Sequence, residues 1–102
     1  MATHALPNVS PPPPGAAILV EVAGRSIAVF NLGSQLAAID AKCTHVGGPL
    51  VEGAVSGSNV TCPWHGSEFD LTTGAVKRGP ATRPVRSYPI RAQGSGLAID
   101  IE

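Results

Sequence analysis

The sequence predicts an all-β domain, a small sandwich or barrel, and three observations support this expectation. Short runs rich in β-branched residues recur along the chain, glycine-containing turns separate them, and no segment keeps a helical period over ten residues. A chain of 102 residues is long enough for one domain with a modest core. Because aromatic residues are only 4% of the chain, that core must be built from Val, Ile, Leu and Ala.

The first segment, residues 1–15, contains Pro7 and the run Pro11–Pro14, followed by Gly15. Such a composition is typical of a polyproline or disordered terminus, so we expect a flexible proline-rich arm rather than a core element. The alternatives are a strap packed on the domain and a segment that binds a partner. The folded domain is then expected to span residues 16–102.

Eight strands are expected within residues 16–102. The first three are separated by turns at Gly24-Arg25 and Gly33-Ser34, which predicts an antiparallel meander. Ile39 and its flanking pattern favour a strand over a turn of helix in the third of them. The expected strands are Ile18–Val22, Ser26–Asn31, Gln35–Asp40, Ala54-Val55, Asn59–Cys62, Ser67–Leu71, Ser87–Ala92 and Leu97–Ile101.

Charge excludes some classes of partner. The formal net charge is zero and 14% of the residues are charged, so no basic stripe indicates a nucleic acid. Arg83, Arg86 and Arg91 are expected to be solvated, with a docking patch as the alternative. No apolar stretch approaches the ~20 residues of a membrane span, and the N-terminus has no pattern of a secretory signal. We therefore expect a cytoplasmic protein.

Two short motifs hold both cysteines and two of the three histidines: Cys43-Thr44-His45 and Cys62-Pro63-Trp64-His65-Gly66. Each cysteine precedes a histidine by two or three positions, which a structural disulfide would not require, so metal ligation is the better interpretation. Glycines follow both pairs, at Gly47-Gly48 and Gly66, and allow the backbone to pass close to a bulky group. The pattern predicts two loops around a metal centre.

Two kinds of centre fit this ligand set. Zinc often binds two cysteines and two histidines, but zinc fingers group the cysteines in one knuckle and the histidines in the other. Here each motif mixes one cysteine with one histidine. The crossed order suits two inequivalent metal positions, one bound by both thiolates and the other by both imidazoles. A zinc-stabilised binding module remains the alternative.

The segments C-T-H-V-G-G-P-L and C-P-W-H-G-S-E-F-D resemble those of the Rieske [2Fe–2S] family, and the resemblance extends from about Ala16 to Glu102. It implies a Rieske-type antiparallel β-sandwich with two cluster-binding loops at one end. It also implies one [2Fe–2S] cluster per chain, with Cys43 and Cys62 on the buried iron and His45 and His65 on the outer iron. Rieske centres have reduction potentials of about −150 to +300 mV.

The same resemblance gives expectations for the surroundings of the cluster. Rieske proteins of respiratory bc complexes carry a disulfide at the positions of Gly48 and Trp64, which are not cysteines here. Ser67 matches a serine whose hydroxyl bonds to a cluster sulfur, although it could instead bond nearby backbone. Phe69 stands in place of a second hydroxyl donor, so we expect a potential below the bc range. Gly66 and Pro80, the latter in a loop covering a third side, complete the surroundings.

The resemblance implies a free-standing electron carrier and not an enzyme. Such a ferredoxin takes electrons from an NAD(P)H-dependent flavin reductase and passes them to a terminal oxygenase or another redox partner. We expect a monomer that binds neither nucleic acid nor membrane. The alternative function is a Rieske-type small subunit of a nitrite reductase or of another oxidoreductase complex.

Overall fold

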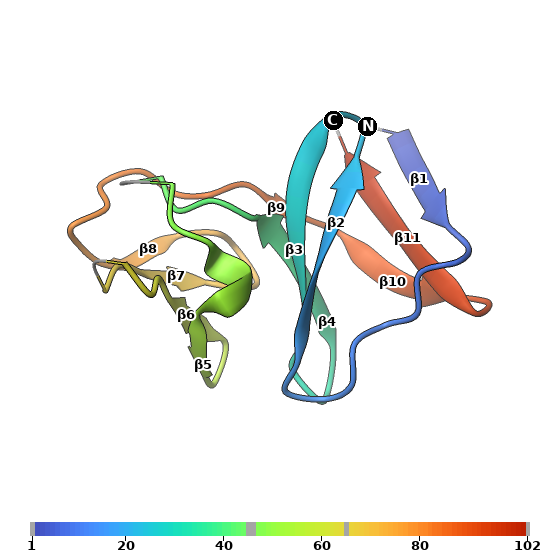
Figure 1. The fold of residues 1–102 in the computed structure, drawn as a ribbon, viewed down its shortest axis with the longest axis horizontal. Helices are drawn as coiled ribbons and strands as arrows, with labels where there is room; N and C mark the ends of the chain where they lie inside the picture. Colours follow the sequence, from blue (N-terminus) through green and yellow to red (C-terminus); the bar gives the residue numbers. More distant parts are fainter. Residues whose placement is uncertain (1, 45–46, 65, 102) are drawn as a thin grey trace.

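The computed structural model describes residues 2–44, 47–64 and 66–101. They form three antiparallel sheets with the strand orders β1-β11-β10, β2-β3-β4-β9 and β5-β6-β7-β8 (Figure 1). The all-β antiparallel class expected from the sequence is therefore confirmed. The elements are β1 (Ala2–Leu6), β2 (Ala17–Val22), β3 (Arg25–Asn31), β4 (Leu36–Asp40), the 3-10 helix η1 (Leu50–Glu52), β5 (Ala54–Ser56), β6 (Asn59–Thr61), β7 (Glu68–Asp70), β8 (Val76–Arg78), β9 (Ser87–Tyr88), β10 (Ile90–Gln93) and β11 (Gly96–Ile101).

The central sheet, β2-β3-β4-β9, separates two apolar clusters. Successive side chains of a strand point to opposite faces, and β3 is apolar on both. Ile27 and Val29 pack into the cluster shared with β11, whereas Ala28 and Phe30 pack into the cluster shared with the β5–β8 sheet. Burial on both faces explains why this strand is an unbroken apolar run. The second cluster contains both cysteines.

The outer sheet includes residues expected to be flexible. The arm prediction is wrong for Ala2–Leu6, which form β1 and pair along their whole length with β11, from Ala2 opposite Ile101 to Leu6 opposite Leu97. The physical reason is that β10 covers only one edge of β11. The other edge offers unpaired backbone groups, which β1 satisfies.

The proline-rich run between β1 and β2 is also tied to the domain. The Asn31 side-chain amide donates to the Pro12 carbonyl at 2.8 Å, and the Gly15 N–H donates to the Asn31 carbonyl at 2.9 Å. Pro12 is buried. This run therefore lies as a strap against the end of β3.

Two further differences concern the later strands. The expected strand Ser87–Ala92 is divided into β9 and β10 at Pro89, which has no N–H to donate to a ladder. β8 is not evident in the sequence because it is a three-residue edge strand whose last two residues, Lys77 and Arg78, are exposed and basic. Ion pairs to β7 accompany it: Lys77 with Asp70 at 3.9 Å and Arg78 with Glu68 at 3.3 Å.

Candidate metal centre

Both cysteines lie in loops at the end of the molecule formed by the β5–β8 sheet (Figure 1). The Cys43 loop leaves β4 and returns to η1, and a bridge between Lys42 and Pro49 closes its base. The Cys62 loop connects β6 to β7. Different strands therefore bring the two motifs, which are far apart in the sequence, to one end of the fold.

The two loops have the same hydrogen-bond frame. The Cys43 N–H donates to the Gly48 carbonyl at 2.9 Å, and the Gly47 N–H donates to the Cys43 carbonyl at 2.8 Å. In the second loop the Cys62 N–H donates to the Ser67 carbonyl at 2.7 Å, and the Gly66 N–H donates to the Cys62 carbonyl at 3.1 Å. Each cysteine thus bonds to the residues four and five positions after it.

The glycine four positions after each cysteine makes this frame possible. Gly47 and Gly66 have φ angles of +75° and +79°, a region that side chains other than glycine's rarely adopt. The two loops differ in the position of the histidine, His45 two residues after its cysteine and His65 three residues after. Both histidines lie outside the described residues.

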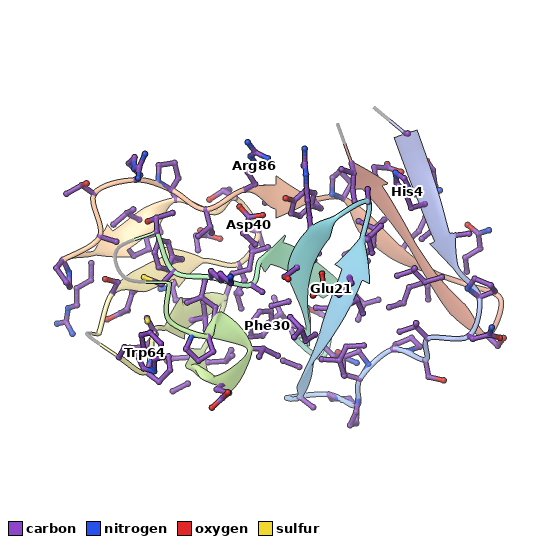
Figure 2. The ribbon with its side chains drawn as sticks, turned by 45° about the horizontal axis from the view of Figure 1, so that its top comes forward. His4, Glu21, Phe30, Asp40, Trp64 and Arg86 are labelled. Atoms are coloured by element: carbon purple, nitrogen blue, oxygen red, sulfur yellow. The ribbon has the colours of Figure 1, made fainter. Side chains whose placement is uncertain are left out.

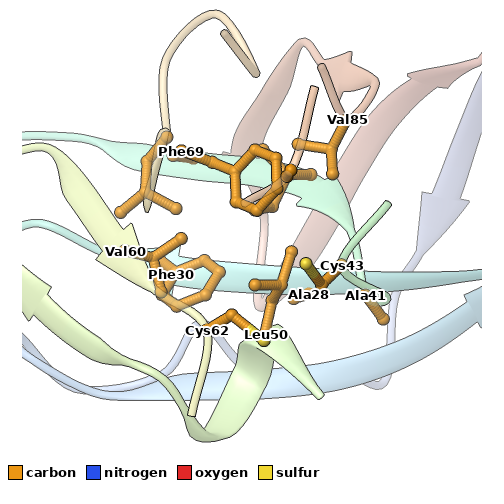
Figure 3. Packing of buried hydrophobic residues seen from close by; sticks show 13 residues of the cluster. Ala28, Phe30, Ala41, Cys43, Leu50, Val60, Cys62, Phe69 and Val85 are labelled. Atoms are coloured by element: carbon orange, nitrogen blue, oxygen red, sulfur yellow. The ribbon is translucent and has the colours of Figure 1, made fainter. Parts of the chain in front are cut away.

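The two thiols are buried, at 3% and 2% exposure, and form no disulfide. Figure 3 shows Cys43 and Cys62 among the apolar side chains of the same cluster, which includes Phe30, Leu50 and Phe69. Buried, unoxidised thiols carried by two equivalent loops are suited to metal ligation as thiolates. Within the described residues, no group of three or more potential metal ligands is present.

Gly48 fits the sulfur of the other loop. A Cβ at this position would stand 2.5 Å from Cys62 Sγ and 3.4 Å from the Trp64 ring. The first loop therefore approaches Cys62 as closely as a glycine permits. Gly48 and Trp64, the positions expected to lack the bc-type disulfide, lie side by side, and Trp64 stays 57% exposed.

Ser67 is fully buried and touches a third segment. Its Oγ accepts the Ala81 N–H at 3.0 Å, a contact that fixes the loop after Pro80. Within the described residues no acceptor receives the hydroxyl hydrogen of Ser67. A buried hydroxyl normally donates its hydrogen to an acceptor. The hydrogen of Ser67 is therefore available to an acceptor in the site.

The third segment also contacts the first loop. Thr44 Oγ1 donates to the Arg83 carbonyl at 2.6 Å. Residues 81–83 therefore touch both cysteine loops. Pro80 itself is exposed, and the ring of Phe69 is fully buried beneath the loops without a hydroxyl to donate.

A polar network supports the start of the first loop and was missed by the sequence analysis. Tyr88 donates to Asp40 Oδ1 at 2.5 Å, and the Arg86 N–H donates to Asp40 Oδ2 at 3.0 Å. The guanidinium of Arg25 lies 5.9 Å from the centre of the Tyr88 ring. Burial, and then the bond to Asp40, raise the pKa of Tyr88 above its usual value of 10.0.

Asp70, by contrast, stabilises the turn that follows β7. Its Oδ1 accepts the Thr72 hydroxyl at 2.6 Å and the Thr72 N–H at 2.8 Å. These bonds lower the pKa of Asp70 below 3.8. The remaining histidine, His4, lies on β1 at the opposite end of the molecule from Trp64 (Figure 2).

These features define a class: an all-β domain with two matched loops that present buried thiols at one end. A family model, the Rieske [2Fe–2S] domain, matches residues 4–89. The chain therefore belongs to the Rieske [2Fe–2S] family, whose domains hold a [2Fe–2S] cluster. No helix among the described residues has the length and apolar character needed to cross a membrane.

Similar proteins are ferredoxin components of dioxygenase systems. The anthranilate 1,2-dioxygenase ferredoxin subunit of Burkholderia cepacia is 42% identical over 81 residues, which are 78% of this chain and 75% of that protein. The solved ferredoxin of carbazole 1,9a-dioxygenase from Nocardioides aromaticivorans IC177 has a TM-score of 0.81 at 27% identity, covering 100% of this chain and 97% of that one. A chain in a complex of reduced oxygenase and oxidized ferredoxin of carbazole 1,9a-dioxygenase has a TM-score of 0.78 at 30% identity, covering 85% and 82%.

Proposed function

We propose that this protein is a one-electron carrier of a dioxygenase-type system. It would receive electrons from an NAD(P)H-dependent flavin reductase and pass them to a terminal oxygenase. The observation that carries the proposal is the pair of matched loops, each presenting a buried cysteine, with Cys62 Sγ against Gly48 of the other loop. The similar proteins that are themselves ferredoxin components of such systems support it.

The proposed ligands are Cys43 and Cys62 on one iron and His45 and His65 on the other. When bound, the cluster supplies reversible one-electron transfer. Two neutral imidazoles in place of two thiolates remove two negative charges, which makes the added electron less costly than in an all-cysteine centre. The chain has two cysteines and three histidines, so its ligands suffice for one centre.

Other residues of the chain prepare the site for that role. Apolar side chains, Leu50 and Phe69 among them, keep water away from the sulfur side. The Ser67 hydroxyl, which accepts the Ala81 N–H, would donate its hydrogen to a sulfur and so raise the potential. Phe69 adds no such bond, and the proposed potential is therefore below that of bc-type Rieske proteins.

We also propose that one chain acts as a monomer with one cluster, because all four ligands come from a single chain. We further propose a cytoplasmic location, a compartment in which cysteines are kept reduced and can serve as metal ligands. Sedimentation of the purified protein at several concentrations checks the first statement. A concentration-dependent dimer would contradict it.

Metal analysis tests the proposed centre. The purified protein should be reddish brown, contain about two irons and two acid-labile sulfides per chain, and give a Rieske-type EPR signal after reduction. Cys62→Ser and His65→Ala should each lose the signal. His4→Ala is the matched control and should keep it, since His4 lies on β1. A colourless, zinc-loaded protein would identify the binding-module alternative instead.

A further inference from the structure

Three exposed cations gather around the base of the Cys43 loop. Lys42 directly precedes Cys43 and is exposed. The Arg83 carbonyl accepts the Thr44 hydroxyl at 2.6 Å, which holds Arg83 beside the same loop. Arg86 lies next to Asp40: the Asp40 N–H donates to the Arg86 carbonyl and the Arg86 N–H donates to Asp40 Oδ2, each at 3.0 Å, and both residues are seen on one face in Figure 2. We call Lys42, Arg83 and Arg86 the basic patch.

The basic patch differs in its ion pairing from three other basic residues of the chain. Lys77, Arg78 and Arg91 each lie within 4 Å of a carboxylate, those of Asp70, Glu68 and Asp100. Within the described residues, no carboxylate forms an ion pair with any member of the basic patch. No neighbouring carboxylate among the described residues therefore neutralises these three positive charges, and they can attract an anionic group that approaches this face.

A surface depression of about 340 Å³ joins part of the patch to a fourth cation. Lys42 and Arg86 line it together with Arg25, from the start of β3. The acidic groups nearby are Asp40, whose oxygens accept from Tyr88 and Arg86, and Glu21, which accepts the Ser26 hydroxyl at 2.8 Å. Among the described residues that line the depression, the basic side chains of Lys42, Arg86 and Arg25 outnumber the one carboxylate, that of Asp40, so this lining is locally positive.

We infer that the basic patch docks an acidic surface on the redox protein with which this chain exchanges electrons. The inference rests on the proposed function, and it adds where and by what charge the partner binds. The position supports it, because the patch adjoins one of the two loops proposed to hold the cluster. Complementary charge beside a redox centre raises the encounter rate and orients the two proteins, by about 10- to 1,000-fold in rate at low salt.

A redox-inert anion tests the location of the patch. Hexacyanochromate(III), a paramagnetic trianion, is titrated into the holoprotein while the Nε–H signals of the arginines are followed by NMR. Arg83 and Arg86 should broaden at the lowest concentrations, and Arg91 of the outer sheet should broaden last. Equal broadening of all three signals, or broadening of Arg91 first, would overturn the inference.

Electron transfer to small reagents tests its consequence. Each reduced protein molecule gives one electron to hexacyanoferrate(III), forming hexacyanoferrate(II), and the rate is measured by stopped flow at several salt concentrations. Lys42→Glu and Arg86→Glu should each slow this reaction roughly three- to tenfold at low salt and speed that of the cation hexaammineruthenium(III). Arg91→Glu, with the same change in net charge, should alter either rate less than about twofold.

The outcomes separate this inference from the proposed function. If all variants behave as Arg91→Glu does, the docking patch is rejected while the electron carrier stands. If the protein binds zinc and transfers no electron, the carrier is rejected and the NMR titration still reports whether the patch attracts anions. Equal iron content in the three variants shows that the rate changes come from surface charge.

Discussion

A methyl group at Gly48 should displace a proposed ligand while leaving the rest of the fold nearly unchanged. The Cβ of Gly48→Ala would stand 2.5 Å from Cys62 Sγ, whereas ordinary contacts begin at 3.4 Å. The sulfur or the first loop must therefore move by about 1 Å. Metal–ligand bonds tolerate deviations of about 0.2 Å, so the displacement is several times larger than the proposed site can absorb.

The expected result is loss of iron from a folded protein. Gly48→Ala should contain well under half the iron and sulfide of the wild type, with altered visible circular dichroism. Overpacking of this kind costs about 1–3 kcal/mol, which lowers thermal stability but leaves the sheets intact. Iron and sulfide per chain, together with far-ultraviolet circular dichroism, measure the two effects separately.

Two matched glycine variants serve as controls. A Cβ at Gly79 would meet its nearest atoms at 3.9 Å, so Gly79→Ala should keep a full complement of iron. A Cβ at Gly53 would clash with the Thr61 carbonyl and Val60, and Gly53→Ala should lose stability without contact with a cysteine. Wild-type iron content in Gly48→Ala would refute the reasoning, as would equal iron loss per folded chain in Gly53→Ala.

Three further changes have expected outcomes. Ser67→Ala should lower the midpoint potential, because it removes the only donor hydrogen that this side chain can offer. If voltammetry shows an unchanged potential, Ser67 does not tune the centre and only fixes the loop through its bond with the Ala81 N–H. Tyr88→Phe should lower the free energy of unfolding by about 1–3 kcal/mol, since the hydroxyl donates to a carboxylate. Because the pKa of Tyr88 is raised in the folded protein, the stabilisation is complete below pH 10 and is lost as the pH rises through the folded pKa. Thr72→Val should raise the lowered pKa of Asp70. The contribution of Asp70 to folding stability is complete above pH 3.8 and is lost as the pH falls through the folded pKa. An NMR titration in which the pKa of the Asp70 carboxyl is the same in the variant and the wild type would contradict this.

The strands that could be predicted are those whose side chains decide their position. In β3, alternate apolar residues serve two different clusters, so both the run and its limits are visible in the sequence. β1 is different, because its place depends on backbone pairing with the free edge of β11. Nothing in its five residues, most of which are exposed, specifies that edge.

The site could be predicted to a similar degree. The frame shared by the loops has a local signal: in both motifs a glycine stands four positions after the cysteine. The support of the first loop by Asp40, Tyr88 and Arg25 has no such signal, because these residues are separated by 63 and 48 positions in the sequence. The sheet topology alone brings them together, with β9 placed beside β4.

Ser67 shows why the sequence left two interpretations open and why they need not exclude each other. A hydroxyl can accept with a lone pair while donating its one hydrogen. The Ala81 N–H uses the lone pair, which explains full burial and the fixed position of the third loop. The hydrogen is then still available to a second acceptor. The same residue can thus fix the loop and tune a sulfur, and only the second role changes the potential.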